Sequence, residues 1–299
     1  MAKNETGTSR RDFLKTSAMT ATGLTVGLNA SVFARAMGAN EKIRMGFIGL
    51  GNRGSGLMNR FMANDDVEVT ALCDVYEPYV LRDRSKVNAR WIDSGKVPKM
   101  GEKFDNKPKI YNDFRELIES KDVDAVCIAT PDHWHAAQTI AALDAGKDIY
   151  VEKPLTITLR EGRAMADAEA KTDRIVAVGL NRRGSSIYQE VEGLVQGGTI
   201  GDVRTARCYR ISNMYPNGIG TLQPEDPPSG FDWDLWLGPR PYRPYQYNIA
   251  PYYFRWWQDY SSQMGNWGVH YMDVIRWMVG ETAPVAVSAH GSKLLGDDK

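Results

Sequence analysis

Short apolar runs alternate with longer amphipathic stretches along the first half of the chain. The apolar runs predict strands, and they lie at 43–48, 67–73, 124–130, 146–151 and 175–180. The stretches between them predict helices over 52–63, 78–94, 113–119, 135–145 and 158–171. Residues 95–109 are polar and predict an insertion. Regular alternation of strand and helix is typical of a doubly wound α/β fold with a parallel sheet.

The second half has a weaker pattern. It predicts helices at 185–196 and 266–279 and strands only at 203–211 and 285–289. Two strands make a poor sheet with exposed edges, so we expect a second domain that is truncated relative to a complete one. Residues 212–263 are rich in proline and aromatic residues, which predicts a long excursion or lid packed by its own rings.

A glycine-rich turn joins the first predicted strand to its helix. Gly49, Gly51 and Gly54 form a G-x-G-x-x-G pattern, and Asp74 ends the next strand twenty residues later. In this context the pattern predicts a dinucleotide site, with the pyrophosphate at the helix N-terminus. Asp74 can accept hydrogen bonds from the adenosine ribose, and its charge would repel a 2′-phosphate, so we expect NAD rather than NADP.

Two further segments end predicted strands, Thr130–His135 (TPDHWH) and Glu152–Pro154 (EKP). In a doubly wound sheet, ligands bind outside the carboxyl ends of the strands. We therefore expect these segments and the glycine turn to meet in one crevice. We expect His133 and His135 to line this crevice and not to bind metal, because no cluster of metal-ligating residues accompanies them.

Composition excludes several classes of protein. The 299 residues carry 37 basic and 37 acidic side chains. The chain therefore lacks the excess of positive charge that is typical of a nucleic-acid-binding protein. Three dispersed cysteines exclude a disulfide scaffold. The N-terminal segment SRRDFLK, a mildly apolar run and Ala34-Arg35-Ala36 indicate a twin-arginine export signal over 1–36. Without that segment the chain has 32 bases and 35 acids, a net charge of −3.

The turn, TPDHWH, AGKDIYVEKPL and GNWGVHYMD (265–273) together resemble the Gfo/Idh/MocA oxidoreductase family. The resemblance runs over 43–290. It implies a Rossmann NAD-binding domain, placed here at 37–180, and a C-terminal α/β substrate domain with an open, largely antiparallel sheet at 181–299.

The resemblance also implies roles for individual residues. Lys153 and His270 would be catalytic, because a partly buried Lys and a His of near-neutral pKa can move protons. Many relatives carry Asp where this chain has Asn266, so Asn266 could orient groups but not share a proton, and Asp273 could supply the missing charge. The expected cofactor-binding residues are Gly49, Gly51, Asn52, Arg53, Gly54, Asp74, Thr130, Pro131, His135, Glu152 and Lys153. The expected substrate-binding residues are Arg183, Trp267 and His270, with Trp267 stacking on a sugar.

These observations predict an exported, periplasmic or extracytoplasmic enzyme that passes hydride between a sugar, glycoside or polyol hydroxyl and a tightly bound NAD. One alternative is an NAD-dependent glycoside hydrolase that oxidises its sugar transiently. Another is a non-catalytic NAD- or sugar-binding protein. We expect a small carbohydrate partner and a homo-oligomer. We expect neither nucleic-acid binding nor stable membrane insertion after signal removal.

Overall fold

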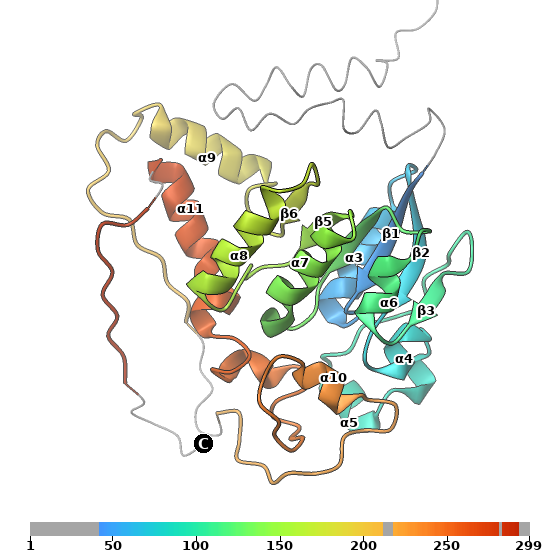
Figure 1. The fold of residues 1–299 in the computed structure, drawn as a ribbon. Coiled ribbons are helices and arrows are strands. Elements are labelled where there is room, and N and C mark those ends of the chain that lie inside the picture. The colour runs from blue at the N-terminus through green and yellow to red at the C-terminus, as the bar shows by residue number, and fades with distance from the viewer. Residues whose placement is uncertain (1–41, 212–217, 281–282, 293–299) are drawn as a thin grey trace, which may run out of the picture. The chain divides into compact units, whose positions relative to one another are not determined.

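The computed structural model describes residues 42–211, 218–280 and 283–292. Its centre is a six-stranded sheet in the order β3-β2-β1-β4-β5-β6 (Figure 1). The pairs β1–β4, β2–β3, β4–β5 and β5–β6 are parallel. The strands are β1 Ile43–Ile48, β2 Val67–Cys73, β3 Lys109–Tyr111, β4 Ala125–Ile128, β5 Asp148–Val151 and β6 Val176–Val178. The Rossmann-type parallel sheet predicted from the sequence is confirmed.

Alternate residues of each strand pack against helices on opposite faces of the sheet. Ile48 belongs to a buried cluster with Leu117 of α6 (Phe114–Glu119) and Leu143 of α7 (His135–Asp144). Its neighbour Phe47 instead contacts the ring of Phe61 on α3 (Asn52–Met62), with ring centroids 5.8 Å apart. Both faces of the sheet are therefore covered, as continuous apolar strands require.

Of the other helices in the first half, the one predicted after β5 is present, whereas the one predicted after β2 is not. The helix predicted over 158–171 forms as α8 (Leu159–Glu169), which begins with a capping box between Thr158 and Glu161. The single helix expected over 78–94 is wrong, because this stretch forms α4 Glu77–Val80, the 3-10 turn η1 Arg84–Lys86 and α5 Ala89–Asp93.

The break in that stretch is at Arg82, whose φ of 54° lies in the left-handed region. The Arg82 guanidinium forms a buried ion pair with Glu102, at 2.5 Å from Nη2 to Oε1. It also donates to the hydroxyl of Ser55 at 3.0 Å. These tertiary contacts compensate a backbone conformation that a non-glycine residue rarely adopts.

The described residues after β6 contain helices but no strands. The elements are α9 Ser186–Gln196, α10 Trp233–Leu237, the 3-10 turn η3 Tyr253–Trp256, the π-helical turn η4 Met264–Gly268 and α11 Val269–Val279. The strands expected at 203–211 and 285–289 are therefore wrong: both segments are irregular and largely exposed. An isolated strand has no hydrogen-bonding neighbour, and the described part of this half offers none.

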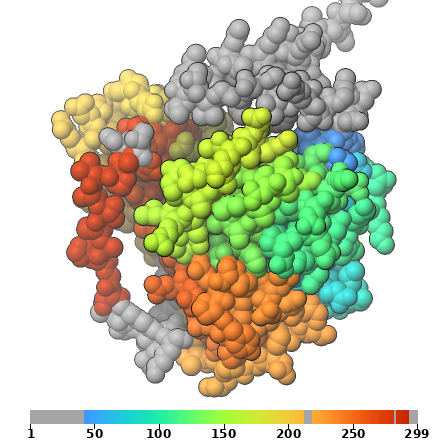
Figure 2. Space-filling model, viewed as in Figure 1, coloured from blue at the N-terminus to red at the C-terminus, as the bar shows by residue number. Residues whose placement is uncertain are grey.

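Residues 218–263, called here the aromatic segment, do not pack only on themselves. Phe231 lies against Tyr76 and Trp91 of the nucleotide-binding half, with ring centroids 5.8 and 5.3 Å away. The backbone of Phe231 also forms an isolated antiparallel bridge with Tyr76. The space-filling view shows the orange surface of this segment continuous with the green and cyan surface of the first half (Figure 2). The expectation of a self-packed lid is corrected in this respect, while residues 212–217 lie outside the described residues.

Within the described ranges, no helix has the length and apolar character needed to cross a membrane. The expected export signal at 1–36 lies outside the described residues.

Replacing Phe231 tests whether the aromatic segment is anchored on the first half. Phe231→Ala removes a ring that is 8% exposed, and we expect a loss of about 3–5 kcal/mol in the free energy of unfolding. The matched control is Tyr242→Ala, because Tyr242 is 75% exposed and its loss should change stability by less than about 0.5 kcal/mol. Urea unfolding measures both, and equal effects would contradict the anchoring.

Candidate active site

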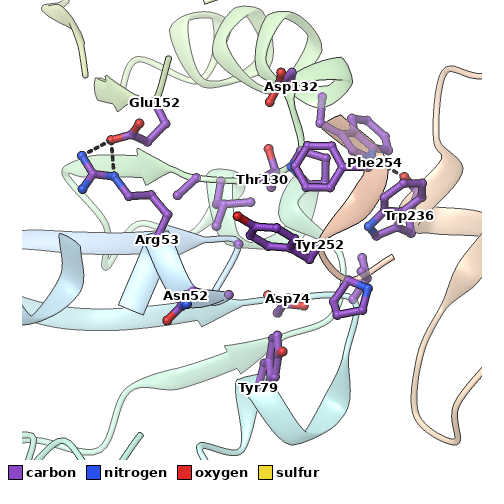
Figure 3. Close-up of a pocket in the computed structure, with 18 of the residues that line it drawn as sticks. Asn52, Arg53, Asp74, Tyr79, Thr130, Asp132, Glu152, Trp236, Tyr252 and Phe254 are labelled. Atoms are coloured by element: carbon purple, nitrogen blue, oxygen red, sulfur yellow. Dashed lines mark hydrogen bonds and ion pairs between the residues drawn. The ribbon is translucent and has the colours of Figure 1, made fainter. Parts of the chain in front are cut away.

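A cavity of about 540 Å³ opens at the carboxyl ends of the strands, between the two halves of the described chain. Its size suits a cofactor or small-molecule ligand. Figure 3 shows side chains from the glycine turn, the strand ends and the aromatic segment converging on it. The predicted site residues that line it are Gly49, Gly51, Asn52, Arg53, Asp74, Thr130, Pro131, Glu152, Lys153, Asn266, Trp267 and His270.

The glycine turn has the geometry of a phosphate cradle. Gly49 has a φ of 86°, and a side chain there would meet the backbone of Thr130 at 2.7 Å. A side chain on Gly54 would come within 1.8 Å of the Gly49 carbonyl oxygen, so Gly54 allows α3 to pack on the turn from behind the cavity wall. A side chain on Gly51 would meet nothing within 4 Å. Gly51 is also the N-cap of α3. No side chain caps the first N–H groups of this helix, which leaves them able to bind a pyrophosphate.

Asp74 ends β2 on the cavity wall. Its carboxylate accepts hydrogen bonds from the backbone N–H of Leu50 at 2.6 Å and of Tyr76 at 2.9 Å. Burial raises the pKa of Asp74 to about 6, against the effect of these hydrogen bonds and the nearby Arg82. The carboxylate is thereby oriented between the glycine turn and the aromatic cluster around Tyr76.

Arg53 and Glu152 form an ion pair on the cavity wall, 2.6 Å from Nη2 to Oε1 (Figure 3). The Glu152 side chain is 5% exposed and the Arg53 side chain 41%. The pair joins the start of α3 to the end of β5, so the two charges neutralise each other at this wall.

Lys153 is held by the other half of the chain. Its Nζ donates to the backbone carbonyl oxygen of Asn266 at 2.8 Å and to the Asn266 side-chain oxygen at 3.2 Å. Burial lowers the pKa of Lys153, while the negative charges of Asp132 and Glu152 oppose the shift. The amine thus lies in the cavity with a reduced affinity for its proton, a property useful in proton transfer.

His270 lies one turn beyond the Lys153 contact, in the first turn of α11. It follows the π-helical turn η4, and such turns occur frequently at functional sites. Gly265 in this turn packs against Pro154, where a side chain would come within 3.1 Å of the proline ring. Burial and, to a smaller extent, the positive charges of Lys153 and Arg182 together lower the pKa of His270 to about 4. At neutral pH its imidazole is therefore uncharged and able to accept a proton.

Besides Gly54, three predicted positions lie away from the cavity. His135 is 1% exposed and lies behind the wall, with its ring nitrogens 2.7 Å from the Pro154 carbonyl oxygen and 3.0 Å from that of Thr130. His133 is also buried, 2.9 Å from the Trp236 carbonyl oxygen. Arg183 forms an ion pair with Asp273 at 2.7 Å outside the cavity. Asp273, expected to support His270, is therefore paired with Arg183.

The structure adds residues to the cavity that the motifs did not assign. Asp132 lies within TPDHWH, is 8% exposed and accepts a hydrogen bond from the Ser261 hydroxyl. The aromatic segment contributes Trp236, Tyr252, Phe254 and Arg255. Its unusual aromatic content was visible in the sequence, but spacing could not show which rings reach the cavity. Trp267 lines the cavity with its ring under the Arg210 guanidinium, 4.3 Å from the ring centroid.

Metal ions are held by several coordinating side chains that lie close together. Across residues 42–211, 218–280 and 283–292, no group of three His, Cys, Asp or Glu side chains could hold a metal ion.

Two family models match this chain. The model of an oxidoreductase family with an NAD-binding Rossmann fold, Gfo/Idh/MocA, matches residues 43–180, and the model of that family's C-terminal α/β domain matches 191–297. The chain belongs to the Gfo/Idh/MocA oxidoreductase family. It thus has a Rossmann domain followed by a C-terminal α/β domain.

Curated relatives include two kinds of enzyme. A glycosyl hydrolase family 109 protein of Shewanella pealeana is 30% identical over 181 residues, covering 56% of this chain and 38% of its own length. An inositol 2-dehydrogenase of Salmonella typhimurium is 32% identical over 162 residues, covering 53% and 43%. The chain thus spans less than half the length of these relatives.

Solved structures show the same fold. A putative dehydrogenase from Bordetella bronchiseptica has a TM-score of 0.50 at 24% identity, over 80% of this chain and 50% of that one. An oxidoreductase domain protein from Kribbella flavida has the same TM-score and identity, over 80% and 54%.

The lowered pKa of His270 predicts a pH dependence of stability. In the unfolded chain His titrates near pH 6.5, whereas in the fold the pKa is about 4. The unfolded state therefore binds more protons between these values, and stability falls as the pH drops from about 6.5 towards 4. We expect His270→Gln to remove up to about 3 kcal/mol of that fall.

The measurement is the difference in free energy of unfolding between wild type and His270→Gln, by urea at a series of pH values. The difference isolates His270 from Asp74 and His133, whose pKa values are also shifted. Parallel pH curves for the two proteins would show that His270 titrates normally.

Proposed function

We propose that this protein is an NAD-dependent oxidoreductase that acts on a hydroxyl group of a sugar, glycoside or polyol. The observation that carries the proposal is the contact of Lys153 with Asn266 next to His270, in the same cavity as the glycine cradle. A dinucleotide bound at Gly51 would extend along the strand ends towards these proton-transferring side chains. Its nicotinamide supplies the hydride acceptor when bound.

Three residues of the chain would carry out proton transfer, charge stabilisation and orientation. Neutral His270 accepts the proton of the substrate hydroxyl as the C–H bond is broken. Lys153 donates a hydrogen bond to the same oxygen and stabilises the negative charge that develops on it. Asn266 orients Lys153 without an opposing charge, so the amine keeps the lowered pKa that burial produces.

The preference for NAD over NADP rests on two acidic residues. Asp74 presents a carboxylate where a ribose 2′-phosphate would lie. Arg82 is the nearby cation whose charge acts on Asp74, but both its Nε and Nη2 donate to Glu102, at 3.0 and 2.5 Å. Its ion pair with Glu102 therefore keeps Arg82 from binding a 2′-phosphate.

Tight retention of the cofactor is supported by the aromatic segment. Tyr252 and Phe254 line the same cavity as the glycine turn (Figure 3). Lys96 lies 4.9 Å from the centroid of the Tyr252 ring. A ligand beneath these rings would leave only when the segment moves, which slows its release.

A transient-oxidation glycoside hydrolase is the second candidate, favoured by the glycosyl hydrolase family 109 relative. It would use the same Lys153 and His270 to oxidise a ring hydroxyl, eliminate the aglycone, add water and reduce the ketone again. Aglycone release without net NADH indicates this reaction, and NADH formation indicates a dehydrogenase. A non-catalytic binding protein would do neither.

Lys153→Ala tests the catalytic role directly. We expect turnover to fall by about 10²–10⁴-fold, the usual contribution of a general acid or base. The affinity for NAD should stay within about threefold, because glycine and backbone N–H groups supply the phosphate cradle. NADH formation and aglycone release from a glycoside panel measure the first quantity, and cofactor-binding calorimetry with NAD and NADP measures the second.

Lys147→Ala is the matched control, because Lys147 donates to backbone carbonyls at 2.7 Å and does not line the cavity. Unchanged turnover in Lys153→Ala would contradict the catalytic role. Failure of the wild type to bind NAD would contradict the proposal as a whole.

We further propose that residues 1–36 direct export through the twin-arginine pathway, on the strength of Arg10, Arg11 and the apolar run after them. This pathway carries folded proteins, which suits an enzyme that leaves the cytoplasm with its cofactor bound. Replacing both arginines by lysine should retain the protein in the cytoplasm. Cell fractionation with immunodetection checks this, and equal export of both forms would refute it.

A further inference from the structure

Arg255 is a cation of the cavity wall that the proposed reaction does not use. It lies in η3 of the aromatic segment and lines the cavity. Its guanidinium carbon is 3.7 Å from the centroid of the Tyr252 ring and 5.2 Å from that of Phe254. Its Nε donates to the Tyr252 carbonyl oxygen at 2.8 Å. One edge of the guanidinium group is thus anchored on aromatic rings and backbone.

The two terminal nitrogens of Arg255 remain available. No carboxylate among the described residues lies within ion-pair distance of them, and they are not among the buried polar atoms without a partner. Because they are not buried and belong to a residue of the cavity wall, a ligand in the cavity can reach them. A guanidinium group held in this way presents a fork that matches a carboxylate.

The charges around Arg255 leave a positive end in the cavity. Arg53 is neutralised by Glu152. Asp132 is close enough for its charge to act on both Arg255 and Lys153, but its carboxyl group is bound by the Ser261 hydroxyl. Arg255 and Lys153 therefore share the single carboxylate of Asp132, and Lys96 adds a further positive charge to the cavity wall. A partly buried cation in excess favours an anionic ligand.

We propose that Arg255 binds a carboxylate of the substrate, so that the cavity selects sugar acids such as uronates and uronides over neutral sugars. The inference rests on the proposed function, since it names the substrate class of the same site. Arg255 and Lys153 line the same cavity.

Direct binding tests the proposal without requiring turnover. Calorimetry on the NAD-loaded full chain compares matched pairs that differ only in the carboxylate: methyl β-D-glucuronide against methyl β-D-glucoside, and the corresponding galacturonide and galactoside. We expect at least one acid to bind tenfold or more tightly than its neutral partner. In Arg255→Gln that advantage should vanish while the neutral sugar and NAD bind within about threefold of wild type.

Two further variants keep the result interpretable. Arg163→Gln is the matched control, because Arg163 forms an exposed i,i+4 pair with Asp167 on α8, and it should preserve the preference for acids. Arg255→Lys retains a charge without the fork and should keep part of the advantage, which covers the case in which the glutamine variant does not fold.

Each outcome has a meaning. Equal binding of acids and neutral sugars by wild type, no binding of either acid, or loss of NAD affinity in the folded Arg255 variants would overturn the proposal, the last by assigning Arg255 to the cofactor. Acid binding that depends on Arg255 without any NADH formation or aglycone release would support Arg255 and refute the proposed function. Turnover of neutral sugars without a preference for acids would support the proposed function and refute the role of Arg255.

Discussion

The hydrogen bonds from Lys153 to Asn266 join the two halves of this protein at its candidate active site. They connect the end of β5 to the π-helical turn η4, across 113 residues of sequence. A buried ammonium group must have hydrogen-bond acceptors, and the carbonyl and amide oxygens of Asn266 supply them. The position of His270 follows from the same contact, because η4 continues directly into α11.

The parallel sheet explains why so many distant residues meet there. Its strands are buried on both faces, so polar side chains can gather only at their ends. Gly49, Asp74, Thr130 and Glu152 all lie at the carboxyl edge for this reason. The aromatic segment completes the cavity from the other side by packing Phe231 between the rings of the first half.

Electrostatic balance divides the cavity into two regions. Near the glycine cradle, Arg53 is neutralised by Glu152 and the first turn of α3 offers N–H groups. Near Lys153, burial lowers the pKa values of both Lys153 and His270, and Arg255 adds a positive charge that no carboxylate in the described part of the chain pairs with. The first region suits a pyrophosphate, and the second suits a hydroxyl group beside an anion.

The nucleotide-binding half was predictable in detail because its signals are local. Apolar runs gave five of the six strands, and the G-x-G-x-x-G pattern with Asp74 indicated the cofactor cradle; only the short edge strand β3 was missed. Arg82 broke the expected helix at 78–94, because its partner Glu102 is separated by twenty residues and no periodicity shows such a contact.

The second half was less predictable. An alternating pattern at 203–211 suggested a strand, yet a strand depends on a neighbour that the pattern cannot supply. The position of Arg183 likewise depends on a tertiary contact, because its ion pair with Asp273 holds it outside the cavity.

Taken alone, the sequence determined the Rossmann fold and the family, and most of the site residues that it predicted line the cavity. These follow from local periodicity and from a turn in which only glycine fits. Only the tertiary structure decided that Asn266 binds Lys153, that His135 lies behind the wall and that Arg255 has no carboxylate partner among the described residues. Those facts depend on burial and on contacts between distant segments, which set both pKa values and charge balance.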